Sequence, residues 1–216
     1  MEKKLEALNF GEEIVLKNNI SLQKAHGLMR RNERYAFRLS FENRKLKARR
    51  VVPEVNLVAT SLLNLLRPLP KLWSMGNVSC IVGNRCKEAD MSLVPEHRTV
   101  KGQFLTQGFC TLVAEILFDK NQLLRSLRQW LSKSTSVNIA IGIKLGEEIW
   151  FYMFVRGQKN HVQVNLNKLQ AGVDDVVKIP LKELYDGSRT PKPDTDYFNL
   201  NLKLLFLVLL QEILLF

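Results

Sequence analysis

Two acidic side chains lie in apolar surroundings, and they are the residues best suited to chemistry. Glu115 comes late in the run GFCTLVAEIL at residues 108–117, which is typical of a strand buried on both faces of a sheet. Asp90 begins a second, shorter apolar stretch upstream. Because an unpaired buried carboxylate is strongly destabilising, each acid needs a cation, a metal ion or a hydrogen-bond donor beside it.

If Asp90 and Glu115 lie on neighbouring central strands, they would form a site for a divalent metal ion, because Mg²⁺ and Mn²⁺ prefer carboxylate oxygens. The alternative is that each acid is a capped or hydrogen-bonded turn residue. Other catalytic arrangements are not evident: the three histidines are scattered, and there is no Gly-rich phosphate loop. The three cysteines form no CxxC pair and indicate a reducing compartment.

The composition indicates one domain, or one domain with an arm, that meets an anionic partner. The chain has 216 residues, of which 46% are hydrophobic, enough for a sizeable core. Its net charge of +11 favours nucleic acid or an anionic membrane surface as the partner.

Much of this charge lies in one segment, residues 30–50. It holds nine basic and two acidic residues, or +7 of the chain's +11, with Tyr35, Phe37 and Phe41 between them. Arginines interleaved with aromatic rings suit phosphate contact and base stacking. The alternative is an amphipathic strand with a solvated charged face. We therefore divide the chain into a basic N-terminal arm, residues 1–50, and a domain, residues 51–216.

Both ends of the chain indicate an intracellular protein, cytoplasmic or nuclear, without a membrane span. The N-terminus has no apolar core of a secretory signal. The apolar C-terminal tail, residues 200–216, is interrupted by polar residues, and its longest clean run is far shorter than the ~20 residues that a spanning helix needs. We expect this tail to be a terminal core helix or strand.

Two amphipathic helices and a series of strands must position the two acids. The helices are predicted at residues 54–66, after Pro53, and at 121–133, where leucines recur on one face. Three consecutive strands with short turns predict an antiparallel meander from residue 137 to 166. The fold class is therefore α/β (α+β): a mixed central β-sheet flanked by helices. The strands expected to share that sheet are residues 78–82, 90–94, 109–117, 137–145 and 149–155.

This order of elements resembles the core of the PD-(D/E)XK superfamily of nucleases, also called restriction-endonuclease-like, and more closely its Uma2-type branch. Residues 87–95, KEADMSLVP, resemble the segment of that branch that carries the Asp. Residues 111–116, TLVAEI, are similar to its strand with the Glu. The helix at 127–134, LRQWLSKS, and the strand at 137–145 complete the likeness, which covers about residues 85–155.

The resemblance implies hydrolysis of DNA phosphodiester bonds with Mg²⁺ or Mn²⁺, held by Asp90 and Glu115. The superfamily usually has a lysine two residues after the Glu, where this chain has Leu117. In the Uma2-type branch the cation lies on the next helix, one turn before its aromatic residue, where this chain has Ser126. The cations that remain as candidates for the catalytic role are Arg125, Arg128 and Lys144.

Three interpretations stay open at this point. The first is an active endonuclease that needs Mg²⁺ or Mn²⁺, and many nucleases of this fold cut as homodimers. The second is a catalytically degenerate nuclease fold that binds nucleic acid or a protein partner. The third is an unrelated α+β protein in which Asp90 and Glu115 are structural acids. A helical basic residue within reach of both acids would favour the first interpretation, and its absence with the basic face intact would favour the second. A large distance between Asp90 and Glu115 would establish the third.

Overall fold

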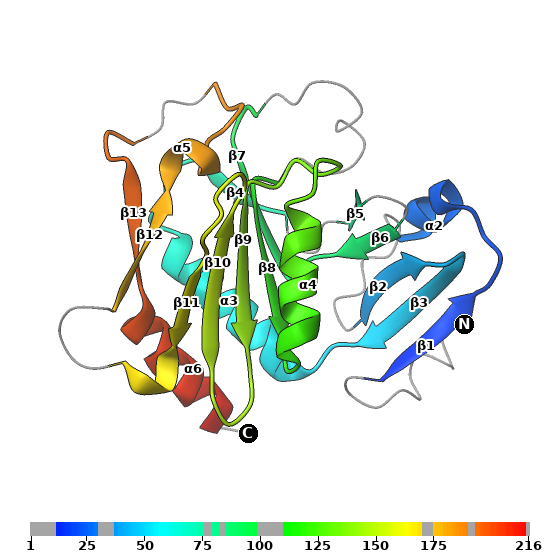
Figure 1. The fold of residues 1–216 in the computed structure, drawn as a ribbon, viewed down its shortest axis with the longest axis horizontal. Helices are drawn as coiled ribbons and strands as arrows, with labels where there is room; N and C mark the ends of the chain where they lie inside the picture. The colour runs from blue at the N-terminus through cyan, green and yellow to red at the C-terminus, as the bar shows by residue number, and fades with distance from the viewer. Residues whose placement is uncertain are drawn as a thin grey trace.

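A computed structural model describes residues 12–29, 37–75, 79–82, 85–98, 110–169, 175–189 and 193–214. Its elements form a six-stranded sheet, a five-stranded sheet, a two-stranded sheet and the helices that pack on them (Figure 1). In chain order they are β1 (Glu13–Lys17), α2 (Leu22–Met29), β2 (Phe37–Glu42), β3 (Lys45–Arg50), α3 (Pro53–Leu66), β4 (Leu72–Ser74), β5 (Ser79–Val82), β6 (Arg85–Glu88), β7 (Met91–Pro95), β8 (Leu112–Leu117), α4 (Lys120–Trp130), β9 (Ile139–Lys144), β10 (Trp150–Val155), β11 (Val162–Asn165), the 3-10 helix η2 (Leu166–Lys168), β12 (Val176–Pro180), α5 (Leu181–Leu184), β13 (Tyr197–Asn201) and α6 (Leu202–Leu214).

The six-stranded sheet holds the predicted central strand. Its strand order is β11-β10-β9-β8-β7-β4, with β8 and β9 parallel and the other neighbours antiparallel. All six residues of β8 are buried, as expected for a continuous apolar strand in the middle of a sheet. The predicted central strand and the meander β9-β10-β11 are thus confirmed, and the fold is a mixed sheet flanked by helices.

Helices cover both faces of this sheet, and side chains from β8 alternate between them. Leu112, Ala114 and Ile116 pack on the back face, in the core that also contains the apolar sides of α3 and α6. Val113 and Leu117 pack on the front face, under α4. Figure 1 shows the resulting layers, with α3 and α6 behind the sheet and α4 in front. Glu115 therefore points to the front, toward α4.

The five-stranded sheet is antiparallel, with the order β1-β3-β2-β6-β5. We expected residues 78–82 in the central sheet, and this was wrong: β5 pairs with β6 in the second sheet. The sequence of a four-residue strand is too short to indicate which strand it pairs with. Here the short connection between β5 and β6 favours pairing between these two strands. Residues 13–50, assigned above to the basic arm, supply β1, β2 and β3, so strands from both sides of residue 50 share one sheet.

Gly142 lets α4 approach the central sheet closely. A Cβ at this position would lie 2.6 Å from Cδ1 of Leu127 and 3.2 Å from Leu123, and both leucines are fully buried in the core under α4. Gly142 is also paired across the sheet with Glu115, so the same close approach brings α4 to the candidate site.

We expect Gly142→Ala to destabilise the protein by about 1–3 kcal/mol, because the added methyl group overfills the space below α4. Urea unfolding of the variant measures this loss. A second substitution, Leu127→Val, removes the clashing methyl position and should restore part of the lost stability. An unchanged unfolding midpoint for Gly142→Ala would show that α4 does not depend on this glycine.

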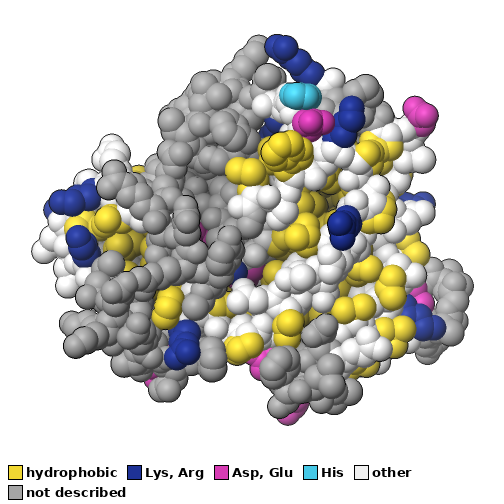
Figure 2. All heavy atoms as spheres, turned by 180° about the vertical axis from the view of Figure 1, so that it is seen from behind, with side chains coloured by type: hydrophobic (Ala, Val, Ile, Leu, Met, Phe, Trp, Pro, Cys, Tyr) yellow, Lys and Arg dark blue, Asp and Glu magenta, His cyan; other side chains and the backbone are white. Residues whose placement is uncertain are grey.

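The C-terminal segment forms β13, which pairs with β12, and then α6, which packs against α3. The expectation of a terminal core element is confirmed, since Leu202, Leu205 and Leu209 are buried. Leu204 and Leu207 of α6 are half-exposed, and Figure 2 shows the apolar side chains scattered over this back face. None of the described helices is long and apolar enough to cross a membrane.

Candidate active site

Glu115 lies at the front of β8 and contacts side chains from two other elements. The indole Nε1 of Trp130, on α4, donates a hydrogen bond to Glu115 Oε1. The ammonium Nζ of Lys87, on β6, lies 2.9 Å from the same oxygen. Only 7% of the Glu115 side chain is exposed, so these partners replace water around the carboxylate.

Lys87 reaches the site from the five-stranded sheet. Besides pairing with Glu115, its Nζ donates a hydrogen bond to Ser126 Oγ and lies 4.7 Å from the ring centroid of Trp130. Ser126 stands where the resembled family would place its cation, one turn before the aromatic residue. In this chain α4 thus supplies the hydroxyl group of Ser126 at that position, and the positive charge comes from Lys87 on β6.

These contacts set the ionisation of Glu115. Burial opposes the charged form, but the positive charge of Lys87 and hydrogen bonds from Trp130, Lys87 and Ser126 outweigh it, so the pKa of Glu115 is lowered from its ordinary value. Glu115 is consequently an ionised carboxylate at neutral pH, held beside an ammonium group.

Asp90 lies directly before β7 and is also held by a cation. Its Oδ1 is 3.1 Å from Nε of Arg38, and its Oδ2 accepts a hydrogen bond of 2.8 Å from the backbone N–H of Ile116 on β8. Arg38 is itself buried and donates to Asn56 at the start of α3. Burial and the nearby charge of Glu115 raise the pKa of Asp90 to about 6, although Arg38 opposes the shift. The two predicted acids therefore interact electrostatically, as a shared site requires.

A cavity of about 340 Å³ opens between the five-stranded sheet and α4, and Glu115 lies in its wall. The front of this sheet is its polar face, because Phe37, Leu39, Phe41, Leu46 and Ala48 turn to the opposite side and form a core with α2. Five basic residues of the polar face line the cavity, and we call them the cationic sheet face: Arg38, Lys47, Arg49, Arg85 and Lys87.

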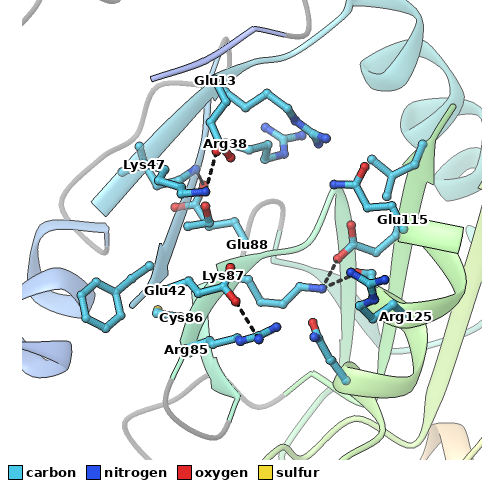
Figure 3. A pocket seen from close by; sticks show the side chains of 18 residues that line it. Glu13, Arg38, Glu42, Lys47, Arg85, Cys86, Lys87, Glu88, Glu115 and Arg125 are labelled. Carbon is cyan, nitrogen blue, oxygen red and sulfur yellow. Dashed lines mark hydrogen bonds and ion pairs between the residues drawn. The ribbon is translucent and has the colours of Figure 1, made fainter. Parts of the chain in front are cut away.

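Acidic residues balance part of the cationic sheet face. Lys47 pairs with Glu13 at 2.7 Å, and Arg85 pairs with Glu42 at 2.6 Å. Figure 3 shows these pairs on one side of the cavity and Arg125 of α4 on the other. The cavity therefore has basic side chains on both walls, which suits an anionic ligand.

Glu88 is a further acid in the cavity wall that we did not select from the sequence. Its Oε2 accepts a hydrogen bond of 2.9 Å from the backbone N–H of Leu39, just beyond the last residue pair of β2 with β6. Burial raises the pKa of Glu88 to about 7, although the Leu39 hydrogen bond and Arg38 oppose the shift. Glu88 thus changes its charge near neutral pH.

Glu88→Gln is expected to reduce the pH dependence of stability. The folded state holds the Glu88 proton to a higher pH than the unfolded chain, whose pKa is near 4.5, so wild type loses stability as the pH rises from 4.5 to about 7. Glutamine can still accept the hydrogen bond from the backbone N–H of Leu39, but it cannot take up or release a proton. The difference between the unfolding free energies at pH 4.5 and pH 7.5 should then be smaller in the variant than in wild type, by up to roughly 3 kcal/mol. Equal pH profiles would contradict this origin of the raised pKa.

In the part of the chain that the structure describes, none of the three predicted cations forms an ion pair with Glu115. Arg125 lines the cavity from α4, whereas Arg128 lies in a shallow depression on the outer side of that helix. Lys144 donates to the Glu148 carbonyl in the turn after β9. Among the described residues, the cation paired with Glu115 is Lys87 of β6, which was not among the three candidates.

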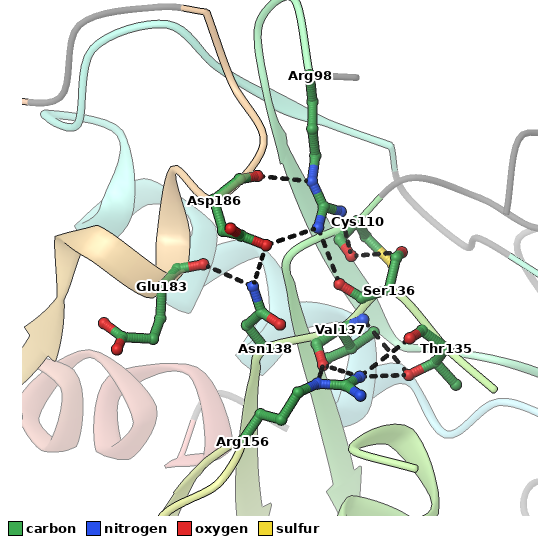
Figure 4. Close-up of polar contacts among 9 residues, drawn as sticks. All are labelled: Arg98, Cys110, Thr135, Ser136, Val137, Asn138, Arg156, Glu183 and Asp186. Atoms are coloured by element: carbon green, nitrogen blue, oxygen red, sulfur yellow. Dashed lines mark hydrogen bonds and ion pairs between the residues drawn. The ribbon is translucent and has the colours of Figure 1, made fainter. Parts of the chain in front are cut away.

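A separate polar cluster fixes the beginnings of β8 and β9 (Figure 4). The guanidinium of Arg98 donates to the carbonyls of Cys110 and Ser136, while Arg156 donates to those of Ser132, Thr135 and Val137. Asp186 completes the cluster by accepting from Asn138 and pairing with Arg98. These bonds hold β8 and β9 in register where the two parallel strands begin, away from the first turn of α4. They thus support the position of Glu115.

The candidate metal ligands are two carboxylates, a donor set that fits Mg²⁺, which commonly takes one or two protein carboxylates and completes its shell with water. In the part of the chain that the structure describes, no group of three or more His, Cys, Asp and Glu side chains is arranged to hold a metal ion. A bound ion would therefore compete with Lys87 for Glu115 and with Arg38 for Asp90.

No known family model and no curated protein matches this chain at the level of sequence. A solved structure does resemble it: a candidate nuclease of the DUF820 family from Anabaena variabilis, with a TM-score of 0.53 and 12% sequence identity. The match covers 79% of this chain and 90% of that one. At this identity the similarity establishes the fold, which is of the restriction-endonuclease-like type.

Proposed function

We propose that this protein is an endonuclease that hydrolyses DNA phosphodiester bonds with Mg²⁺ or Mn²⁺. The observation that carries the proposal is the pairing of Glu115 with Lys87 in the wall of a cavity with basic walls, near enough to Asp90 for the charge of Glu115 to raise the pKa of Asp90. A nuclease of this fold needs two acids and one cation at that place, and the candidate nuclease of similar fold adds support.

Each side chain of the site then has a role. Asp90 and Glu115 would hold the metal ion, which supplies Lewis-acid activation of the scissile phosphate and of a bound water. Lys87 would bind a phosphate oxygen once the ion takes its place beside Glu115, because an ammonium group is a compact phosphate ligand on a flexible stem. Arg125, on the opposite wall, would bind the neighbouring phosphate, because a planar guanidinium matches the geometry of phosphate oxygens.

The cationic sheet face would bind the DNA backbone, which makes affinity sensitive to salt. Lys45, Lys47 and Arg49 alternate along one side of β3, and the last two belong to the cationic sheet face. Replacing all three by glutamine should lower the slope of log affinity against log salt by about 0.9 for each phosphate that the protein no longer neutralises. Fluorescence anisotropy with a labelled oligonucleotide in EDTA measures the slope without cleavage.

The matched control carries the same charge change on the far side of the molecule, in β12, α5 and α6: Lys178, Lys182 and Lys203 to glutamine. This control should keep the wild-type slope. If the two triple variants have equal slopes, the basic residues of β3 only solvate the surface.

A catalytically degenerate domain that binds nucleic acid is the second candidate. One specific observation favours it: both acids already have a cation from the protein itself, Lys87 for Glu115 and Arg38 for Asp90. Such a domain would bind DNA with the same salt dependence, but neither Mg²⁺ nor Mn²⁺ would stabilise it or produce cleavage. The metal titration described in the Discussion separates the two candidates.

A further inference from the structure

A second, smaller pocket adjoins the cavity and differs from it in chemistry. It has a volume of about 190 Å³ and shares Arg49, Leu117 and Gln122 with the cavity wall. Its remaining walls come from around the start of α3 and the end of β8, and they are apolar except for Asp119: Val51, Val52, Val55, Ile116, Phe118 and Asp119. The volume is below the roughly 300–1,000 Å³ of pockets for drug-sized ligands, so it suits a single planar ring system.

Phe118 provides a flat apolar surface at this pocket. It follows β8 directly and precedes Asp119, which caps α4 by accepting the backbone N–H of Gln122. The side chain is 50% exposed, although its neighbours Leu117 and Ile116 are buried. A large exposed aromatic ring beside a pocket with apolar walls is available to stack on a planar ligand.

We propose that this pocket binds an unpaired base of a single DNA strand whose backbone lies along the cationic sheet face. The inference rests on the proposed function and names the form of DNA that the site accepts. Arg49 belongs to both the cavity and the pocket, so it can bind the phosphate that connects the seated base to the rest of the strand. The Gln122 side chain adds an amide donor and acceptor for a base edge.

The geometry favours a single strand over a duplex. Bases within a duplex are stacked on each other and present only their edges in the grooves, so they cannot stack on Phe118. Unpaired bases offer a free ring face, and proteins that bind single strands combine a basic groove with aromatic side chains for this reason. The cavity and the pocket together supply both parts.

Binding of labelled oligonucleotides in EDTA tests the inference without cleavage. The probes are oligothymidylate of about 12 nucleotides, within the site size of single-strand binding folds, the same strand in a duplex with oligoadenylate, and oligouridylate. We expect the single DNA strand to bind at least about 10-fold more tightly than the duplex. Phe118→Ala should weaken single-strand binding by about 5- to 150-fold, the range for loss of one stacked base.

Two further variants make the result specific. Phe118→Tyr keeps the ring and should keep the affinity, whereas Tyr197→Ala removes an exposed ring from β13 and should change nothing. Tighter binding of the duplex, or equal affinities of Phe118→Ala and wild type for oligothymidylate, would overturn the inference. Tighter binding of oligouridylate would overturn the assignment to DNA. Because no metal ion is present, these outcomes are independent of hydrolysis, so a protein that binds as expected but never cuts refutes only the proposed function.

Discussion

Lys87→Met is expected to destabilise the protein by about 3–5 kcal/mol, because it leaves the carboxylate of Glu115 buried without its cation. The hydrogen bonds from Trp130 and Ser126 remain, but they cannot replace a full positive charge. The pKa of Glu115 should rise in the variant, so its stability should recover as the pH falls and the acid takes up a proton. Urea unfolding at pH 5 and pH 8 measures both effects.

Two companion variants identify the cause. The double variant Lys87→Met with Glu115→Gln removes both charges and should recover most of the lost stability. Arg85→Met, on the same strand and the same face, breaks an ion pair in which both side chains are largely exposed, and should cost less than about 1 kcal/mol. If Lys87→Met costs no more than Arg85→Met, Lys87 does not neutralise Glu115 in solution.

Glu115→Gln is expected to lower the rate of DNA cleavage by at least about 10³-fold, because a metal ion contributes several kcal/mol to the stabilisation of the transition state. The fold should tolerate the change: glutamine can still accept from Trp130, and Lys87 borders the cavity, where it can meet water. Cleavage of a labelled oligonucleotide under single-turnover conditions gives the rates.

Glu13→Gln is the matched control, since Glu13 also lines the cavity but lies on β1 and pairs with Lys47 at a partly exposed site. It should retain cleavage within about fivefold, because an exposed pair contributes less than about 1 kcal/mol. Similar losses in Glu13→Gln and Glu115→Gln would mean that the charge of the cavity, rather than a metal ligand, controls the rate.

The fold around Glu115 could be predicted because its signals are local. The apolar run of residues 112–117, the leucine spacing of α4 and the strict alternation of β9 each indicate an element by itself. Residues 37–42 form β2, so the strand that we gave as the alternative for the basic segment is present, but its basic residue Arg38 is buried rather than solvated. Residues 30–36 of that segment and residues 99–109, which include the start of the predicted strand, lie outside the described residues.

The partners of the two acids could not be predicted, because they depend on contacts between distant segments. Arg38 is 52 residues from Asp90 and meets it only because β2 pairs with β6. Lys87 stands three residues before Asp90, but it reaches Glu115 because β6 belongs to the second sheet and turns its side chain toward α4. Lys87 is the first residue of the segment KEADMSLVP, and the resemblance of that segment to the Asp-bearing segment of the Uma2-type branch was the one signal that pointed to this lysine.

Thermal unfolding in the presence and absence of divalent metal ions tests most directly whether Asp90 and Glu115 hold one ion. At a concentration about 100 times its dissociation constant, Mn²⁺ or Mg²⁺ should stabilise the folded protein by about 2.7 kcal/mol, which raises the melting temperature of a domain of this size by roughly 5–10 °C. Glu115→Gln should lose that increase, and Glu13→Gln should retain it. A wild-type melting temperature that neither ion changes at any concentration would contradict the metal site and leave Glu115 as a structural partner of Lys87.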